Sequence, residues 1–246
     1  MSLRLRQICL VAPALEPVVG TLCDVLGIEV FYRDPNVGKY GLVNAVMPVG
    51  DTFLEVVAPT QPGTAAARYL ARRGGEGGYM VILDCDAIEP WIDHVASVGV
   101  RVANDLDYAG EYRGLQLHPR DTGGTLLEIN WSHGSAQGAY HPAGPDWHGG
   151  APLPAIVGAT VQSDDPAALA ERWASILRRP VTEAGIALDQ GTLRFVAATD
   201  GRGEGLAGID VLAADRAGVL AAAAARGLAV GGDLLWVGGV WVRVLG

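Results

Sequence analysis

The chain has 246 residues, of which 50% are hydrophobic and 18% are charged, with a formal net charge of −9. This composition excludes intrinsic disorder, which requires low hydrophobicity and high charge, and the length is enough for one or two domains with a proper core. Because an acidic chain without a segregated basic patch repels phosphate, we expect no nucleic-acid partner.

The N-terminus and the cysteines predict the cellular location. Residues 1–13 have a short apolar part and no small-residue cleavage site, and the apolar stretch 218–228 is too short to span a bilayer. Cys9, Cys23 and Cys85 are odd in number and lack CxxC spacing, so we expect small buried hydrophobes rather than disulfides or a zinc site. We therefore predict a cytoplasmic protein without a membrane partner.

The first half of the chain has the pattern strand, helix and three strands, and this pattern occurs twice. In the first unit, a helix at 15–26 is accompanied by strands at 4–12, 28–34, 40–49 and 52–58. In the second, a helix at 88–98 is accompanied by strands at 78–85, 100–108, 112–118 and 124–131. A short helix at 64–73 is predicted between the two units.

Sequence similarity between the two units indicates a duplication. Residues 14–17 (ALEP) recur as 87–90 (AIEP), 73 residues later, and at the same offset 51–55 (DTFLE) aligns with 124–128 (GTLLE). Both helical patterns also end at a glycine, Gly27 or Gly99, which is a helix stop signal. We interpret residues 1–131 as a pair of βαβββ modules.

The remaining residues repeat the pattern in a weaker form. Residues 132–153 are rich in Gly, Pro, Ala and His without periodicity, which predicts a linker or a lid. A strand at 156–162, a helix at 166–177 and a strand at 193–198 follow, and then a strand at 208–213, a helix at 215–226 and strands at 234–237 and 240–245. We predict an α+β fold of four βαβββ modules, the last abbreviated, in which 154–246 form a degenerate C-terminal pair.

The order of these motifs resembles the vicinal oxygen chelate superfamily, which includes glyoxalase I, extradiol dioxygenases, bleomycin-resistance proteins and methylmalonyl-CoA epimerase. Residues 117–128 (LHPRDTGGTLLE) are most similar to the epimerase. The resemblance implies two curved mixed sheets around cavities, in which modules pair about a pseudo-twofold axis. It also implies metal ligands on the first and last strands of each module, which here are Gln7, Glu55, Met80 and Glu128. The family usually has histidine at the first-strand positions, and this chain has none there.

Glu55 and Glu128 are the strongest candidates for chemistry. Each lies in mid-strand between apolar neighbours, and an isolated glutamate of this kind usually points to solvent. Equivalent positions of a duplicated module converge on the pseudo-axis, however, so we expect both to face a shared cavity. Two buried carboxylates repel each other, and one should have a raised pKa unless a cation lies between them.

Two arrangements of this pair remain open. In one, a divalent metal is held by Glu55, Glu128 and the amide oxygen of Gln7, and such an all-oxygen set suits Mg, Mn or Ca. In the other, no metal is bound and one glutamate acts as a general base while the other is protonated. The thioether of Met80 is a poor ligand for any hard ion.

Several other residues are candidates for the same site. His118, at the end of a strand that also carries Gln116, is a candidate acid, base or hydrogen-bonding group near Glu128, or else a surface residue. The candidate substrate-binding residues are Gln7, Tyr40, Asn44, Tyr79, Met80, Asn130 and Trp131. We expect His133, His141 and His148 to be exposed to solvent, unless Tyr140, Trp147 and Trp131 make the segment an aromatic lid. His94, on the second helix, carries no predicted role.

The C-terminal modules lack this chemistry. Their positions equivalent to Glu55 and Glu128 are predicted to be Phe195 and Arg243, and their first strands contain no histidine. This excludes an extradiol dioxygenase, because such an enzyme needs two histidines and a carboxylate for iron. We expect this pair to be structural or to form an interface, with a homodimer as an open alternative.

Two functions remain. The first is an isomerase, epimerase or lyase that moves a proton next to a carbonyl group of a small-molecule substrate through Glu55, Glu128 and His118. The second is a non-catalytic protein that binds a small molecule for sequestration or resistance, which the missing histidines favour.

Overall fold

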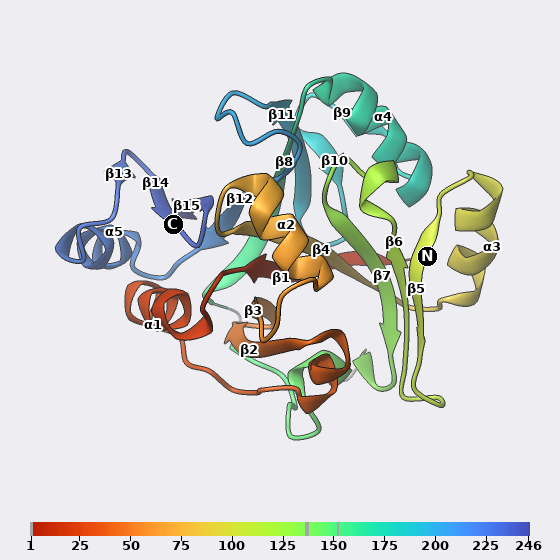
Figure 1. Cartoon of the computed structure of the whole chain (residues 1–246), viewed down its shortest axis with the longest axis horizontal. Coiled ribbons are helices and arrows are strands. Elements are labelled where there is room, and N and C mark those ends of the chain that lie inside the picture. The colour runs from red at the N-terminus through yellow and green to blue at the C-terminus, as the bar shows by residue number, and fades with distance from the viewer. Residues whose placement is uncertain (1, 136–137, 152) are drawn as a thin grey trace.

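The structure, a computed structural model, describes residues 2–135, 138–151 and 153–246, which form two open mixed sheets with helices packed against them (Figure 1). The seven-stranded sheet has the order β2-β3-β1-β4-β7-β6-β5 and the eight-stranded sheet the order β13-β14-β15-β12-β8-β11-β10-β9. The expected α+β fold of repeated modules is thereby confirmed. The strands of the first sheet are β1 (Leu3–Val11), β2 (Leu42–Val49), β3 (Thr52–Pro59), β4 (Gly77–Cys85), β5 (Val102–Asp107), β6 (Tyr112–Leu117) and β7 (Leu126–Ser132).

The second sheet and the helices complete the set of elements. Its strands are β8 (Ala155–Ser163), β9 (Val181–Thr182), β10 (Gly185–Ala187), β11 (Thr192–Ala197), β12 (Gly205–Leu212), β13 (Val230–Gly231), β14 (Leu234–Val237) and β15 (Val240–Leu245). The helices are α1 (Leu15–Leu26), α2 (Ala65–Arg73), α3 (Glu89–Ser97), α4 (Pro166–Leu177) and α5 (Arg216–Ala225), with short 3₁₀ turns η1 (Pro35–Tyr40), η2 (Pro119–Asp121) and η4 (His141–Ala143).

In the first sheet the two modules pair within one chain. β1 and β4 run antiparallel at the centre, while β3 lies parallel to β1 and β7 parallel to β4. The register places Glu55 beside Cys9 and Glu128 beside Ile82. Because Cys9 and Ile82 are equivalent under the 73-residue offset, the two glutamates occupy equivalent positions of the duplicated module.

The second sheet has the same arrangement around β8 and β12, and its register corrects one expectation. β11 places Arg194 beside Thr160 and β15 places Arg243 beside Asp210, and these two central-strand residues pair with Gly208 and Gly158 across β8 and β12. In the first sheet, Cys9 and Ile82, the neighbours of Glu55 and Glu128, pair with Met80 and Gln7 in the same way. The position equivalent to Glu55 is therefore Arg194, and the assignment of Phe195 is wrong by one residue. The position equivalent to Glu128 is Arg243, as expected.

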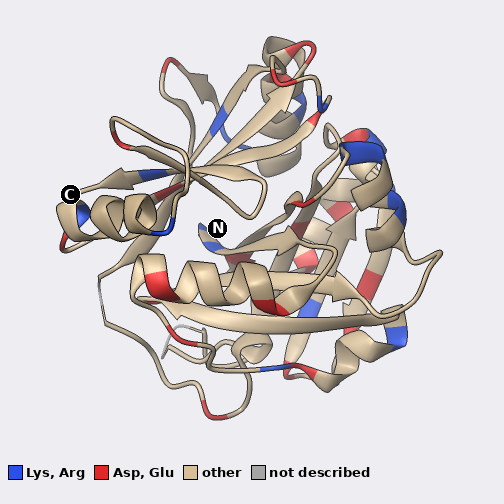
Figure 2. Ribbon diagram, turned by 60° about the vertical axis from the view of Figure 1, so that its left-hand side comes forward, with Lys and Arg blue, Asp and Glu red and all other residues tan. Residues whose placement is uncertain are grey.

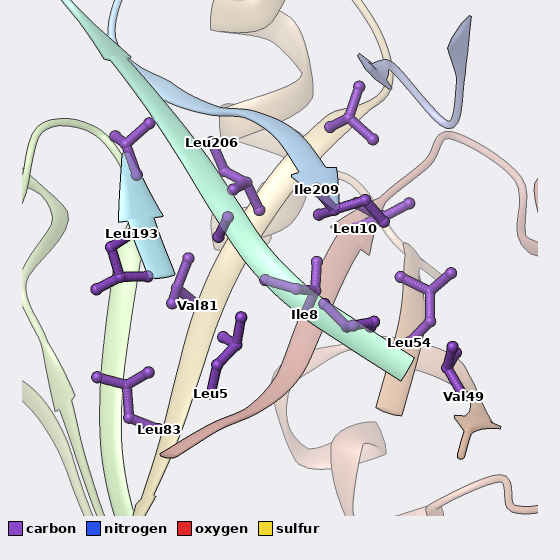
Figure 3. Close-up of a cluster of buried hydrophobic side chains, with 14 of the residues drawn as sticks. Leu5, Ile8, Leu10, Val49, Leu54, Val81, Leu83, Leu193, Leu206 and Ile209 are labelled. Atoms are coloured by element: carbon purple, nitrogen blue, oxygen red, sulfur yellow. The ribbon is translucent and has the colours of Figure 1, made fainter. Parts of the chain in front are cut away.

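The two sheets share one hydrophobic core. Leucine, isoleucine and valine side chains from β1, β3 and β4 meet those from β11 and β12 between the sheets (Figure 3). At the closest approach, a Cβ on Gly78 would lie 2.5 Å from Leu206, so this position of β4 admits no side chain. Helix α1 adds its apolar stripe to the same core and ends at Gly27, whose φ of 65° few other residues adopt.

The opposite face of the first sheet is covered at its two ends. Helix α2 packs Tyr69 and Leu70 on the side chains of β1 and β4. At the other end, Tyr140 and Trp147 pack against Phe53, with ring centroids 4.8 and 5.0 Å apart, so part of the 132–153 segment forms an aromatic cover. Residues 136–137 and 152 of that segment lie outside the described residues. The middle of this face is left for the cavity.

Some predicted elements differ from the observed ones. The strand predicted at 28–34 is reduced to an isolated bridge between Tyr32 and Val46, because Pro35 follows and begins η1. The short strands β9, β10 and β13 were not predicted, since two or three residues carry no alternation signal. Among the described residues, no helix is long and apolar enough to cross a membrane.

Candidate functional site

A cavity of about 890 Å³ lies on the face of the first sheet that points away from the second sheet. Its walls come from strands of both N-terminal modules, from α2 and from the turns η1, η2 and η4. Eight predicted site residues line it: Gln7, Tyr40, Asn44, Glu55, Tyr79, Met80, His118 and Glu128. The duplicated modules thus bring both carboxylates to one cavity.

Glu55 lies on β3 and is only 8% exposed. Its two carboxylate oxygens accept hydrogen bonds from the Gln7 amide at 2.8 Å and from the Asn44 amide at 2.7 Å. Burial raises the pKa of Glu55; hydrogen bonds from Asn44, Cys9 and Gln7 lower it in part, and the charge of Glu128 raises it further. The result is a carboxyl that holds its proton more tightly than an ordinary glutamate.

Glu128, on β7, is 3% exposed and has a different set of donors. One oxygen accepts hydrogen bonds from the Tyr112 hydroxyl and from the Asn130 amide at 3.0 Å, and the other from the Gln116 amide at 2.8 Å. Burial and the neighbouring Glu128 carboxylate raise the pKa of Tyr112 well above its ordinary value. Tyr112 is therefore a neutral hydroxyl that donates its proton to the hydrogen bond with Glu128.

Tyr112 is a site residue that the sequence analysis missed. It lies on β6 at the two-residue spacing that also includes Gly114, Gln116 and His118, so strand alternation was the signal that would have found it. A Cβ on Gly114 would lie 2.9 Å from the Tyr112 hydroxyl. The glycine therefore leaves room for the tyrosine to bend across the sheet to Glu128.

Two predicted site residues, Asn130 and Trp131, do not line the cavity. Asn130 is fully buried behind Glu128 and also contacts the Tyr140 hydroxyl at 3.4 Å. Trp131 lies outside the cavity and packs against the core on the other face of β7. His118 lines the cavity, and its Nδ1 accepts a hydrogen bond from the Arg120 amide, which begins η2. No hydrogen bond between His118 and Glu128 occurs in the described part of the chain.

An aromatic group forms one edge of the opening. The His141 ring lies 5.2 Å from Tyr112 and 5.1 Å from Tyr108, measured between centroids. His141 is exposed, as expected, but it also lines the cavity, and burial of part of its ring lowers its pKa. His94 instead bonds the Ser175 carbonyl at 2.9 Å, between α3 and α4.

The predicted metal set, Gln7, Glu55 and Glu128, lines the cavity, but its donors fit a metal poorly. Within the described chain, no three His, Cys, Asp or Glu side chains come together as a metal site. Every carboxylate oxygen of the pair already accepts a hydrogen bond from a protein donor, and Gln7 turns its NH₂ group toward Glu55. The buried Gln7 Oε1 has no partner among the described atoms and could accept one donor from a ligand. These contacts describe a hydrogen-bonded carboxyl pair and fit a metal site poorly.

The second sheet carries opposite charges at the equivalent positions. Arg194 and Arg243 both bind the buried Asp210, and two nitrogens of Arg243 lie 2.9 Å from its carboxylate. Burial alone would raise the pKa of Asp210, but the hydrogen bonds from Arg243 and Arg194 lower it. The potential site on this sheet is thus occupied by an internal ion pair.

Comparisons with known proteins find similarities to the N-terminal half and to the whole fold of this chain. The model of the Glyoxalase/Bleomycin resistance protein/Dioxygenase superfamily matches residues 4–129. A search of curated proteins finds no match.

Solved structures extend the likeness to the second half. A triple mutant of 4-hydroxymandelate synthase from Streptomyces coelicolor is 16% identical, with a TM-score of 0.70 over 92% of this chain and 75% of that chain, and so shares the fold across both sheets. A variant of Streptomyces coelicolor methylmalonyl-CoA epimerase in complex with 2-nitronate-propionyl-CoA is 25% identical over 52% of this chain and 96% of that chain, with a TM-score of 0.47. Methylmalonyl-CoA epimerase from Mycobacterium tuberculosis is 21% identical over 55% of this chain and 92% of that chain, also with a TM-score of 0.47.

Proposed function

The chain belongs to the Glyoxalase/Bleomycin resistance protein/Dioxygenase superfamily, and from this premise we propose that it is an isomerase, epimerase or lyase that moves a proton next to a carbonyl group. The reaction takes place in the cavity of the first sheet, and Glu55 is the group that takes and returns the proton. The substrate is a small organic molecule with an acidic C–H bond beside a carbonyl.

The observation that carries this proposal is the unequal pair of buried carboxyls in one cavity. Glu55 has a raised pKa and only amide and thiol donors around it, whereas Glu128 is held by the Tyr112 hydroxyl in addition to two amides. A general base works best when its pKa lies near the working pH, and burial moves Glu55 in that direction. The deprotonated form of Glu55 takes the substrate proton, and the nearby Glu128 helps to raise the pKa of Glu55 toward the working pH.

The amide groups around the pair suit a carbonyl substrate. Each of Gln7, Asn44 and Gln116 uses one N–H on a carboxylate and has a second N–H. Such a donor, placed at the substrate carbonyl oxygen, stabilises the negative charge that develops as the proton leaves. The cavity therefore combines a base and donors for an enolate-like transition state.

Proton exchange in heavy water tests the proposal. A panel consisting of a 1,3-dicarbonyl acid, an α-hydroxy ketone and a 2-substituted acyl thioester is incubated with the protein in D₂O, and deuterium at the α-carbon is followed by proton NMR. We expect exchange of at least one member, reduced by about 100-fold or more in Glu55→Gln. The exposed Glu183→Gln is the matched control and should keep the rate.

A non-catalytic ligand-binding protein is the second candidate. It is favoured by the fact that both oxygens of each carboxylate already accept protein hydrogen bonds, as in a structural network. Binding of a panel member without exchange in the wild-type protein would support this candidate and contradict the enzyme.

A further inference from the structure

Charge is unevenly distributed around the cavity. Its buried floor carries Glu55 and Glu128, whereas four exposed cations line its mouth. These are Lys39, Arg68, Arg72 and Arg120. In a chain with a net charge of −9 and 18 Lys and Arg residues in total, such a concentration at one opening is unusual. Figure 2 shows basic positions on helix α2, which lies beside strands of the first sheet that carry acidic positions.

The four cations have no carboxylate partner in the described part of the chain, whereas nine of the other fourteen arginines form a salt bridge. Lys39 donates to the Tyr108 hydroxyl at 2.9 Å and also lies over the Tyr40 ring. Arg68 donates a hydrogen bond to the Gly63 carbonyl, and Arg72 lies over the Tyr69 ring. These contacts orient the side chains and leave their charges uncompensated.

Two acidic residues also line the cavity, and both are engaged elsewhere. Asp34 accepts hydrogen bonds from the backbone and side chain of Asn36, where it caps η1. Glu204 accepts from the Ser163 hydroxyl, on the second sheet. Neither forms an ion pair with a cation of the mouth within the residues that the structure covers.

Helix stability does not account for this placement. Arg68 and Arg72 are four residues apart on α2, so they are neighbours on one face, and like charges at this spacing destabilise a helix. Arg72, in the last turn, gains from the helix dipole, but Arg68 does not. Arg120 and Lys39 come from η2 and η1, so three separate elements converge on the opening.

We propose that the mouth of the cavity binds an anionic group of the ligand, a phosphate ester or a carboxylate, while the reacting carbon lies at Glu55 and Glu128. The volume of about 890 Å³ is near the upper end for small-molecule sites, so there is room for a ligand that spans floor and mouth. Four cations gathered at one opening also concentrate anionic ligands there. This inference rests on the proposed function in that it takes the same cavity as the ligand site.

Three probes of similar size separate the possible anions: phenyl phosphate, benzoate and uncharged benzyl alcohol. Their dissociation constants are measured by calorimetry at low and high ionic strength. We expect both anions to bind more tightly than the alcohol, with an advantage that falls as salt is added. Tighter binding of phenyl phosphate assigns the group as a phosphate ester, and tighter binding of benzoate assigns it as a carboxylate.

Substitutions of the cations test whether the anion binds at the mouth of the cavity. We expect Arg68→Gln/Arg72→Gln to weaken anion binding by at least about fivefold, and Arg120→Gln, on a different element, to weaken it as well. The control is Arg178→Gln, which removes an exposed charge away from the cavity. Equal binding of all three probes, or an equal loss in Arg178→Gln, would overturn the inference.

Glu55→Gln separates this inference from the proposed function. It should abolish proton exchange and leave anion binding intact, because the cations of the mouth are unchanged. Anion binding without exchange in the wild-type protein contradicts the proposed function alone. Exchange without preference for an anion contradicts this inference alone.

Discussion

At the scale of single residues, the site depends on which donor each carboxylate receives. Glu55 is met by the amides of Gln7 and Asn44, and Glu128 by a tyrosine hydroxyl and two amides. Two chemically identical side chains at equivalent positions therefore have different hydrogen-bond donors around them. The duplication supplies the pair, and the flanking strands supply the difference.

The contribution of Tyr112 to the stability of the protein can be measured with a variant. In Tyr112→Phe, Glu128 loses a donor inside a buried site, and we expect the free energy of unfolding to fall by about 1–3 kcal/mol at neutral pH. Urea denaturation measures it. Tyr108→Phe, at a more exposed tyrosine of the same cavity, is the control and should change stability less.

The raised pKa of Glu55 predicts a pH dependence of stability. The folded protein binds the Glu55 proton more tightly than the unfolded chain does, so the associated stability is fully present below the ordinary value of 4.5 and is lost as pH rises through the folded value. Glu55→Gln cannot titrate, so its stability relative to wild type should increase as pH rises from 4.5 to the folded pKa of Glu55 and should level off above it. Urea denaturation over a pH series measures the difference, and a difference independent of pH would contradict the assignment.

These residues show which parts of the site the sequence could predict. Period-two alternation and the 73-residue offset placed Glu55 and Glu128 at one cavity, and the family resemblance added Gln7 and Met80. They were not enough for Lys39, Arg68 or His141, which reach the cavity from a helix and turns whose orientation depends on tertiary packing. Trp131 was assigned to the site through its neighbours, although alternation places it on the face opposite Glu128.

At the scale of elements, helix α2 is the part of the cavity wall most dependent on the second half. The buried Arg73 at its C-terminal end donates to the carbonyls of Arg202, Gly203 and Glu204 at 2.8–3.0 Å. Arg202 in turn donates to the carbonyls of Arg73 and Gly239. These two arginines join α2 to the loop before β12.

Removing this connection should loosen the helix. We expect Arg73→Met to lower the free energy of unfolding by about 1.5–3 kcal/mol, because charge-assisted hydrogen bonds to three carbonyls are lost. Hydrogen exchange of the α2 amides should also become faster. In Arg178→Met, the exposed control, neither quantity should change appreciably.

The contact between the sheets gives a second prediction for an element. Gly78→Ala adds a methyl group 2.5 Å from Leu206 and should cost about 1–3 kcal/mol in unfolding free energy, measured by thermal or urea denaturation. Gly20→Ala, in the middle of α1 with open space around it, should instead stabilise by about 0.5–1 kcal/mol. Equal effects of the two changes would contradict the described packing of β4 on β12.

At the scale of the whole molecule, the second half repeats the fold but not the site. The positions of Glu55 and Glu128 are taken by Arg194 and Arg243, which bind Asp210. Sequence periodicity could predict the repeated modules, yet a register error of one residue exchanged Arg194 for Phe195. The division of the chain at 131 and 154 stays a prediction, because one core joins the two sheets.

Asp210→Asn tests the structural role of this ion pair. The loss of the charge between two arginines should cost about 1–3 kcal/mol in unfolding free energy, moderated by the partial exposure of both arginines. Because the lowered pKa of Asp210 gives stability that is lost as pH falls, the variant should also flatten the acid limb of the stability curve. Anion binding at the cavity of the first sheet should be unchanged.

Glu55 and Glu128 interact across the buried floor of one cavity. The most direct test is an NMR titration of the glutamate side-chain carboxyl carbons in the wild-type protein and in Glu128→Gln. We expect Glu55 to titrate above the ordinary glutamate range and its pKa to fall when the charge of Glu128 is removed. An ordinary pKa for Glu55, or a raised one that is the same in both proteins, would contradict the account.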